Sequence, residues 1–361
     1  MLIDIIAGAR PNFMKIAPII HAIQKKKKSL IEYRLIHTGQ HYDKNMSSNF
    51  FKQLNIPLPH VNLDVGSGSQ AVQTSKIMVK YEELLLQKPS NLCLVVGDVN
   101  STMACAITAR KLYIPVAHVE GGIRSGDWSM PEEINRVVTD SITNYFFTTS
   151  KFANENLKHA GIKNSSIFFV GNTMIDTLLK NLDRLKKPPI WDTLNLQVGE
   201  YFVLTMHRPI NVDEKTVLLE NINKILEGAN GLPVLFPVHP RTAKTILDVK
   251  NLPSTLHCID PQSYLEFNYL VKNAKAVITD SGGITEEATV LGIPCLTLRD
   301  STERPETIEI GTNELVGSRP KSLVSHFEKI INGKWKKGGI PEKWDGKAGE
   351  RIIDILVELL C

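Results

Sequence analysis

Short apolar runs rich in β-branched residues alternate with longer amphipathic stretches along almost the whole chain. An apolar run followed by helical periodicity is typical of a βαβ unit, whose parallel strands are buried on both faces. One series of runs ends near residue 170, and a second follows the linker-like segment LKKPPIWDTLNLQVGE. The predicted strands cover residues 2–7, 31–37, 92–96, 115–119, 145–148 and 167–170, and then 201–206, 233–237, 255–259, 276–279 and 294–298.

Two Rossmann-like α/β domains are therefore expected, the first over residues 1–171 and the second over residues 172–344. The chain has 361 residues, of which 42% are hydrophobic and 22% charged, so it is long enough for two cores. Residues 345–361 form an amphipathic stretch whose apolar face, which includes Ile352 and Leu356, must be buried against another element.

Composition argues against several classes of partner. The net charge is only +4, and the dense basic run Lys25–Lys28 follows an apolar helical pattern, which favours a solvated helix end over a nucleic-acid patch. The five cysteines are scattered without metal-ligand spacing, as expected for thiols in a reducing cytoplasm. The N-terminal apolar run is too short to span a bilayer and has no basic segment before it. We expect a cytoplasmic protein with no nucleic acid, membrane or metal partner.

The ends of the predicted strands are unusually polar, and ligands of open α/β sheets bind beyond the carboxyl ends of the strands. Asp98, Glu120 and Glu132 all fall at or just after strand ends of the first domain. Three carboxylates in one crevice would raise the pKa of at least one of them, which suits proton transfer at carbon. Asp98 as a helix cap and Glu132 as part of a first helical turn are the structural alternatives. His207 ends the first strand of the second domain. It is a candidate general acid or hydrogen-bond donor to a phosphate, or else a structural side chain.

The segment TDSGGITEEATVLGIP suggests a nucleotide site. Gly282 and Gly283 are expected to form a tight turn at a helix N-terminus, where unpaired N–H groups and the helix dipole favour a phosphate. Glu286 and Glu287 lie one turn further along and can accept hydrogen bonds from ribose hydroxyls. The alternative is a glycine turn followed by two acids that only stabilise the start of a helix.

Arg10 and Lys15 flank the end of the first strand and could neutralise a diphosphate, or could be a basic surface at a helix start. The segment Gly66–Ala71, GSGSQA, follows a plausible short strand and matches the relaxed dinucleotide fingerprint. It sits at the third strand, and no later strand ends in an acid at the expected distance, so NAD binding is not favoured there.

Taken together, the motifs GARPNFMK, TGQH, GDVNST, HVEGGIRSGD, PEEINR, GNT, HRP, DSGGITEEA and RDSTERPE resemble the non-hydrolysing UDP-N-acetylglucosamine 2-epimerases, in the same order and spacing. The resemblance implies two Rossmann-like domains that face a central cleft, as in glycosyltransferase-B enzymes, with residues 345–361 crossing back to the first domain. It also implies a homodimer. The implied reaction is anti elimination of UDP and its re-addition through a 2-acetamidoglucal, without a cofactor.

The resemblance also implies roles for matched residues. The proton-transfer residues would be Asp98, Glu120 and Glu132, with His207 at the departing phosphate and Arg136 in support. The substrate-binding residues would be Arg10, Lys15, Phe267 through its nearby backbone, Ser281, Gly282, Gly283, Glu287 and Arg304. Which carboxylate takes the C2 proton stays open, as do the groups at C3 and C6. A 2-epimerase of UDP-2,3-diacetamido sugars or their uronic acids, a glycosyltransferase of the same fold and a catalytically silent nucleotide-sugar sensor are the alternatives.

A departure from the family pattern bears on regulation. Many bacterial members are activated by UDP-N-acetylglucosamine, bound partly by polar residues after TGQH. Tyr42 stands where those members commonly have Arg, and Asp43 follows it. Loss of the guanidinium and gain of a carboxylate both disfavour a second diphosphate, so a weak or absent activator site is expected.

Overall fold

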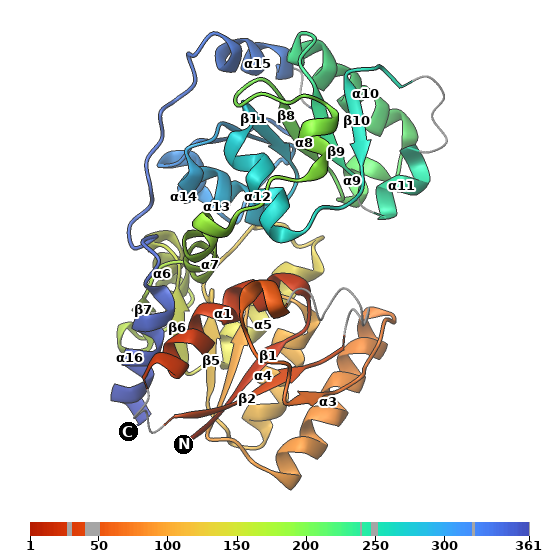
Figure 1. The fold of residues 1–361 in the computed structure, drawn as a ribbon. Coiled ribbons are helices and arrows are strands. Elements are labelled where there is room, and N and C mark those ends of the chain that lie inside the picture. Colours follow the sequence, from red (N-terminus) through yellow and green to blue (C-terminus); the bar gives the residue numbers. More distant parts are fainter. Residues whose placement is uncertain (27–30, 40–50, 239, 247–251, 320–321, 361) are drawn as a thin grey trace. The chain divides into compact units, whose positions relative to one another are not determined.

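The computed structural model describes residues 1–26, 31–39, 51–238, 240–246, 252–319 and 322–360 (Figure 1). The chain divides into two units, Met1–Lys180 with Glu342–Cys361, and Asn181–Pro341. Each unit is a parallel sheet with helices, as the sequence predicts. The first boundary lies nine residues after the expected residue 171, because Ile175 and Leu178 are fully buried in the first unit. That two domains face a cleft stays a prediction.

The sheet of the first unit has the order β3-β2-β1-β4-β5-β6-β7 within the described residues. Its adjacent strands pair in parallel. The strands are β1 (Leu2–Ala7), β2 (Glu32–His37), β3 (Val61–Asn62), β4 (Leu92–Val96), β5 (Val116–Val119), β6 (Tyr145–Thr148) and β7 (Ile167–Phe169). The helices are α1 (Arg10–Lys25), α3 (Gln70–Gln87), α4 (Asn100–Lys111), α5 (Pro131–Ile142), α6 (Lys151–His159), α7 (Thr173–Asn181) and α16 (Ala348–Leu360).

The second unit repeats this winding with the strand order β10-β9-β8-β11-β12-β13 in the described residues. Its strands are β8 (Phe202–Thr205), β9 (Val234–Pro237), β10 (Leu256–Ile259), β11 (Ala276–Thr279), β12 (Cys295–Thr297) and β13 (Asn313–Leu315). Its helices are α8 (Pro189–Thr193), α9 (Pro209–Val212), α10 (Lys215–Ala229), α11 (Pro240–Ile246), α12 (Tyr264–Asn273), α13 (Gly282–Leu291), α14 (Pro305–Glu309) and α15 (Leu323–Ile331). The order is that of a doubly wound nucleotide-binding sheet, in which ligands bind where the winding reverses.

Alternation of side chains explains why the central strand β4 is apolar throughout. In β4, Leu94 and Val96 join the core on one face of the sheet, whereas Cys93 and Val95 join the core on the other. Both faces are covered by helices, so each strand must be apolar at successive positions. The predicted strands agree with the observed ones to within one residue at each end. β13 is missed by the sequence because its residues, Asn-Glu-Leu, give no apolar run.

The final helix α16 packs on the first unit, as the resemblance implies. Ile352, Ile353 and Leu356 belong to the same core as α1, beside which α16 lies in Figure 1. A Cβ added at Gly349 would come within 2.7 Å of the Pro18 carbonyl group, so a glycine permits the two helices to cross closely.

Asp176 fastens the start of α16 to α7. Its Oδ2 accepts a hydrogen bond from the Gly349 N–H at 2.7 Å, and its side chain is buried. Burial raises the pKa of Asp176 to about 6, although the N–H groups of Gly349 and Ala348 work against the rise. Since this pKa exceeds that of an unfolded aspartate, the folded chain holds the proton more tightly, and this stabilising contribution is lost as pH rises through 6.

We predict that Asp176→Asn removes this pH dependence, because Asn keeps the acceptor and carries no charge. Between about pH 5 and about pH 7.5, the wild type should lose about 1 kcal/mol of unfolding free energy that the variant retains. Denaturant unfolding across this range measures the difference. The exposed Asp183→Asn is the control and should follow the wild type. Parallel pH curves for wild type and Asp176→Asn would contradict the prediction.

Candidate active site

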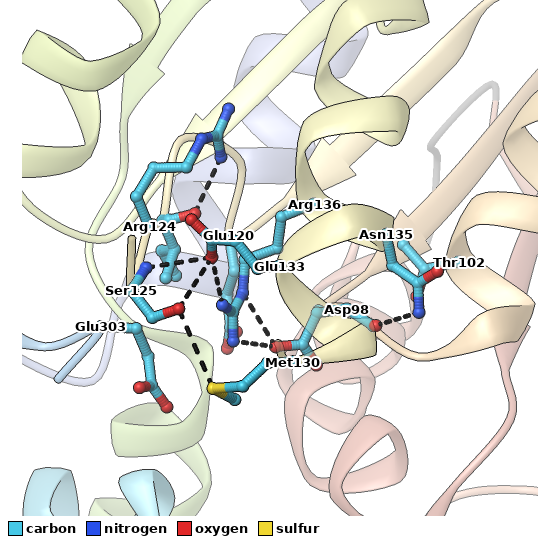
Figure 2. Close-up of polar contacts among 12 residues, drawn as sticks. Asp98, Thr102, Glu120, Arg124, Ser125, Met130, Glu133, Asn135, Arg136 and Glu303 are labelled. Carbon is cyan, nitrogen blue, oxygen red and sulfur yellow. Dashed lines mark hydrogen bonds and ion pairs between the residues drawn. The ribbon is translucent and has the colours of Figure 1, made fainter. Parts of the chain in front are cut away.

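Asp98 follows β4 through Gly97, whose φ of +69° suits glycine at this turn. The Asp98 Oδ2 accepts hydrogen bonds from Arg136 Nε at 3.0 Å and Nη2 at 2.6 Å (Figure 2). Arg136 projects from α5 and is buried, whereas the Asp98 side chain keeps 29% of its surface exposed. The structure therefore brings together two predicted site residues, with the guanidinium fixing the orientation of a partly accessible carboxylate.

Glu120 follows β5 directly and adopts a left-handed backbone conformation with φ of +71°, which is unusual for a residue other than glycine. Its N–H donates to the Phe147 carbonyl oxygen at 2.9 Å. Its Oε2 accepts a hydrogen bond from Lys15 Nζ at 2.7 Å, and both side chains are buried. The structure thus places the Lys15 amine on a candidate catalytic acid, and not at an open phosphate site.

Glu132 and Glu133 lie in the first turn of α5 but have different surroundings. Glu132 is half-buried and makes no hydrogen bond or ion pair with the part of the chain that the structure describes. Glu133 is buried and accepts hydrogen bonds from Ser125 N at 3.0 Å, Gly126 N at 3.1 Å and Arg136 Nη1 at 2.6 Å (Figure 2). Burial works against ionisation, but these donors outweigh it and lower the pKa of Glu133.

Glu133 is a site residue that the sequence reasoning missed. It links the Ser125–Gly126 turn to the guanidinium that holds Asp98. Its spacing of three residues from Arg136 on a helix was a usable signal. The sequence also predicts mutual repulsion among the acids. In the structure, cations lie 2.6 to 2.7 Å from Asp98 and Glu120, and their positive charges offset this repulsion.

Arg10 is exposed at the first residue of α1. Two residues later, Asn12 accepts hydrogen bonds from Gly8 N at 3.0 Å and Ala9 N at 2.8 Å, and donates one to the Val96 carbonyl oxygen at 3.1 Å. Asn12 therefore fixes the turn before Arg10 against the end of β4. Tyr42 and Asp43, on which the activator expectation rests, lie outside the described residues.

In the second unit, His207 follows β8 and is held by a buried acid. Its Nδ1 lies 2.8 Å from Asp280 Oδ1, and the backbone N–H groups of His207 and Arg208 donate to the same carboxylate. Burial acts against ionisation of Asp280, but the hydrogen bond and charge of His207 outweigh it and lower the pKa of Asp280. Asp280 is a positioning residue that sequence reasoning missed, and 45% of the His207 side chain stays exposed.

The expected phosphate turn begins α13. Ser281 is its N-cap, and Gly282 and Gly283 are its first two residues, with neither φ in the left-handed region. The glycines are thus helical and do not form the tight turn that the sequence suggested. A Cβ at Gly282 would lie 2.5 Å from Glu303 Oε1, so a larger residue there would have to displace the end of the Glu303 side chain. Glu303 is paired with the buried Arg299 at 2.5 Å.

The two adjacent acids of α13 also have different partners. Glu287 is buried, and its Oε1 accepts a hydrogen bond from the Tyr264 hydroxyl at 2.8 Å. Burial raises the pKa of Glu287 to about 7, although Tyr264 and Asn268 act against the rise. Glu286 pairs with Arg304 at 2.6 Å, and both are buried, so the predicted substrate-binding Arg304 neutralises an acid in the helix.

Phe267 lies in α12, and its N–H donates to the Ser263 carbonyl oxygen at 2.8 Å. This amide is therefore already satisfied within the helix. Among the described residues, no group of three or more His, Cys, Asp or Glu side chains could hold a metal ion. None of the helices that the structure describes is both long and apolar enough to cross a membrane.

The doubly wound units and the acids at the ends of their strands place the chain among α/β proteins of the glycosyltransferase-B type. The fold is shared with the Phytolacca americana UGT2, which is 11% identical, with a TM-score of 0.59 over 99% of this chain and 93% of that one. The family model for UDP-N-acetylglucosamine 2-epimerase matches residues 22–357. The chain belongs to this family.

Relatives match over the full length. The UDP-N-acetylglucosamine 2-epimerase of Methanocaldococcus jannaschii is 43% identical over 99% of both chains. Its crystal structure with UDP-GlcNAc and UDP has a TM-score of 0.88 and covers 99% of this chain and 100% of that one. The UDP-2,3-diacetamido-2,3-dideoxy-D-glucuronate 2-epimerase of Pseudomonas aeruginosa is 38% identical, over 99% of this chain and 100% of its own.

The adjacent glutamates of α5 provide a matched test of the site geometry. We predict that Glu133→Gln lowers stability by about 1 to 3 kcal/mol, because it removes one of the two carboxylates that pair with the buried Arg136. Glu132→Gln should change stability by less than about 0.5 kcal/mol, since it breaks no ion pair. Denaturant unfolding at neutral pH measures both. Equal stability of the two variants would contradict the assigned contacts.

Proposed function

We propose that this chain interconverts UDP-N-acetylglucosamine and UDP-N-acetylmannosamine. The observation that carries the proposal is the set of acids at the carboxyl ends of β4 and β5 and at the start of α5, in a member of the 2-epimerase family. Two of these acids, Asp98 and Glu120, are each oriented by a buried cation. Oriented carboxylates are suited to removing and returning a proton at carbon.

The reaction proceeds by elimination and re-addition. A carboxylate takes the C2 proton, the C1–O bond breaks, and UDP leaves with the bonding electron pair while a C1–C2 double bond forms. A second acid then protonates C2 on the opposite face, and the phosphate oxygen of UDP adds to C1. Asp98, Glu120 and Glu132 supply the base and the acid. The sugar undergoes no net oxidation, so the reaction requires no cofactor.

The second unit binds UDP. Ser281 and the N–H groups of Gly282 and Gly283, at the N-terminus of α13, hold the diphosphate, aided by the dipole of the helix. Glu287 accepts hydrogen bonds from the ribose, and the backbone near Phe267 meets the uracil. His207 is aimed by Asp280 and donates to the departing phosphate.

Four cations also have roles in the proposal. Arg10 contacts the phosphates, and Lys15 does so only by leaving Glu120. Arg136 acts through Asp98, which it holds by two hydrogen bonds. Arg304 acts through Glu286 at the centre of α13.

A UDP-2,3-diacetamido uronic acid is the second candidate substrate. It is favoured by the Pseudomonas aeruginosa relative, which is 38% identical and is named for that substrate. The same acids and the same UDP site would serve either sugar, because the chemistry takes place at C1 and C2. We further propose a cytoplasmic location, which suits the free thiols of Cys93, Cys105 and Cys295.

We predict that the enzyme inverts C2 of UDP-N-acetylglucosamine in D2O, with deuterium entering C2 when no acceptor is present. NMR of a panel of UDP-sugars measures both inversion and exchange. Asp98→Asn, Glu120→Gln and Glu132→Gln should each lower kcat by about 10²-fold or more. The exposed Glu83→Gln is the control and should keep full activity. Inversion of only the diacetamido sugar would establish the second candidate, and binding without exchange would overturn both.

We also predict a homodimer formed through the first unit. Val72, Val79 and Leu86 recur every seven residues on α3, which places them on one face, and they are 45%, 55% and 69% exposed. Sedimentation at micromolar concentration should give a dimer, and Val79→Glu with Leu86→Glu should give a monomer. The exposed Val198→Glu in the second unit is the control and should remain dimeric. A monomeric wild type would refute the prediction.

A further inference from the structure

His118 is a fully buried histidine to which the reaction described above gives no role. It lies in β5, two residues before Glu120. Its Nε2 is 2.8 Å from the Gly97 carbonyl oxygen, and its Nδ1 is 2.7 Å from Asp140 Oδ1. The ring therefore joins the turn after β4 to an acid on α5.

The geometry requires both ring nitrogens of His118 to donate. The Gly97 carbonyl oxygen can only accept, so Nε2 carries a proton. Asp140 also accepts hydrogen bonds, from Gly122 N at 3.0 Å and from Arg124 at 2.7 Å. Burial acts against its ionisation, but His118 and Arg124 outweigh burial and lower the pKa of Asp140. Asp140 Oδ1 therefore accepts from Nδ1, and both ring nitrogens of His118 donate.

The glycines after Glu120 make room for this pair. A Cβ at Gly121 would lie 3.0 Å from a Phe146 ring carbon and 3.4 Å from Asp140 Oδ1. Gly122 has φ of +82°, and a Cβ there would lie 2.3 Å from the Ala153 carbonyl oxygen. Immediately after Glu120 the chain therefore packs closely against Phe146 and the His118–Asp140 pair at Gly121, and against α6 at Gly122.

We propose that His118 is a positioning residue for Asp98, Glu120 and Glu132. This inference rests on the proposed function. One N–H of the ring fixes Gly97, the residue before Asp98. The other fixes Asp140, which holds the Gly122 turn after Glu120 and belongs to α5, the helix of Glu132. One ring thus connects the three segments that carry the three acids.

The positioning role requires both ring nitrogens of His118 to donate a hydrogen bond. A neutral ring has a single N–H and would leave either the Gly97 carbonyl oxygen or the Asp140 carboxylate without a hydrogen bond from His118. Both groups are buried, where an unmet acceptor is costly. Displacement of a catalytic group by about 1 Å can lower the rate by about 10²-fold. Loss of either hydrogen bond of His118 should therefore lower kcat.

Two substitutions separate the two bonds. His118→Asn keeps a donor near Nδ1 for Asp140 but loses the bond to Gly97, and His118→Gln keeps a donor near Nε2 but loses the bond to Asp140. Each should lower kcat by about 10-fold to 100-fold and leave the Kd for UDP, measured by calorimetry, within about 2-fold. Tyr81→Phe is the control, because it removes another buried hydrogen bond of the first unit, to Asp4, and should keep kcat. Wild-type kcat in both His118 variants would overturn the proposal.

Two measurements on the unreacted protein test the positioning without activity. Nitrogen-15 NMR of the wild type should show both His118 ring nitrogens protonated at neutral pH. Hydrogen exchange should be faster in the His118 variants at the amides of residues 97–100 and 120–124, and unchanged there in Tyr81→Phe. A singly protonated ring, or unchanged exchange in the variants, would overturn the role. If the wild type inverts no UDP-sugar, the proposed function fails, and these two measurements still decide the positioning role.

Discussion

Burial of both faces of a parallel sheet restricts where charged side chains can gather. In each unit most side chains of the central strands are apolar and are covered by the connecting helices, and polar ones such as Asp4 and His118 are buried with a partner. The carboxyl ends of the strands remain, and there helix N-termini and polar turns meet. Asp98, Glu120, His207 and Asp280 all occupy such ends. The winding of the sheets therefore decides which residues can form a site before any particular side chain is considered.

Most of the fold could be predicted from the sequence, because the signals are local. Apolar runs fix the strands, and the amphipathic period of α16 requires a buried face, which Ile352 and Leu356 provide. The domain boundary was less accessible, since Ile175 and Leu178 fit a helix of either unit equally well by pattern. β13 was inaccessible because Asn313 and Glu314 form a strand only through pairing with β12.

The sequence also supplies candidate site residues, but it does not supply their partners. Lys15 and Arg304 were assigned to substrate, as is natural for basic residues near phosphate motifs. In the structure, both cations pair with buried acids, Glu120 and Glu286. An unpaired buried charge is strongly destabilising, so a buried cation tends to be matched by an acid from another part of the chain. Spacing along the sequence does not reveal such pairs unless they share a helix, as Glu133 and Arg136 do.

The kind of donor separates the buried acids into two groups. Glu133 and Asp140 each contact an arginine directly, Asp280 contacts His207, and the pKa values of these three acids are lowered in spite of burial. Asp176 and Glu287 receive hydrogen bonds from amides or a hydroxyl, and burial raises their pKa values to about 6 and about 7. Neutral donors compensate only part of the lost hydration, whereas an adjacent cation compensates the charge itself. The acids that position the proposed catalytic groups are therefore permanently ionised near neutral pH, while the acid proposed to bind the ribose can still change its charge.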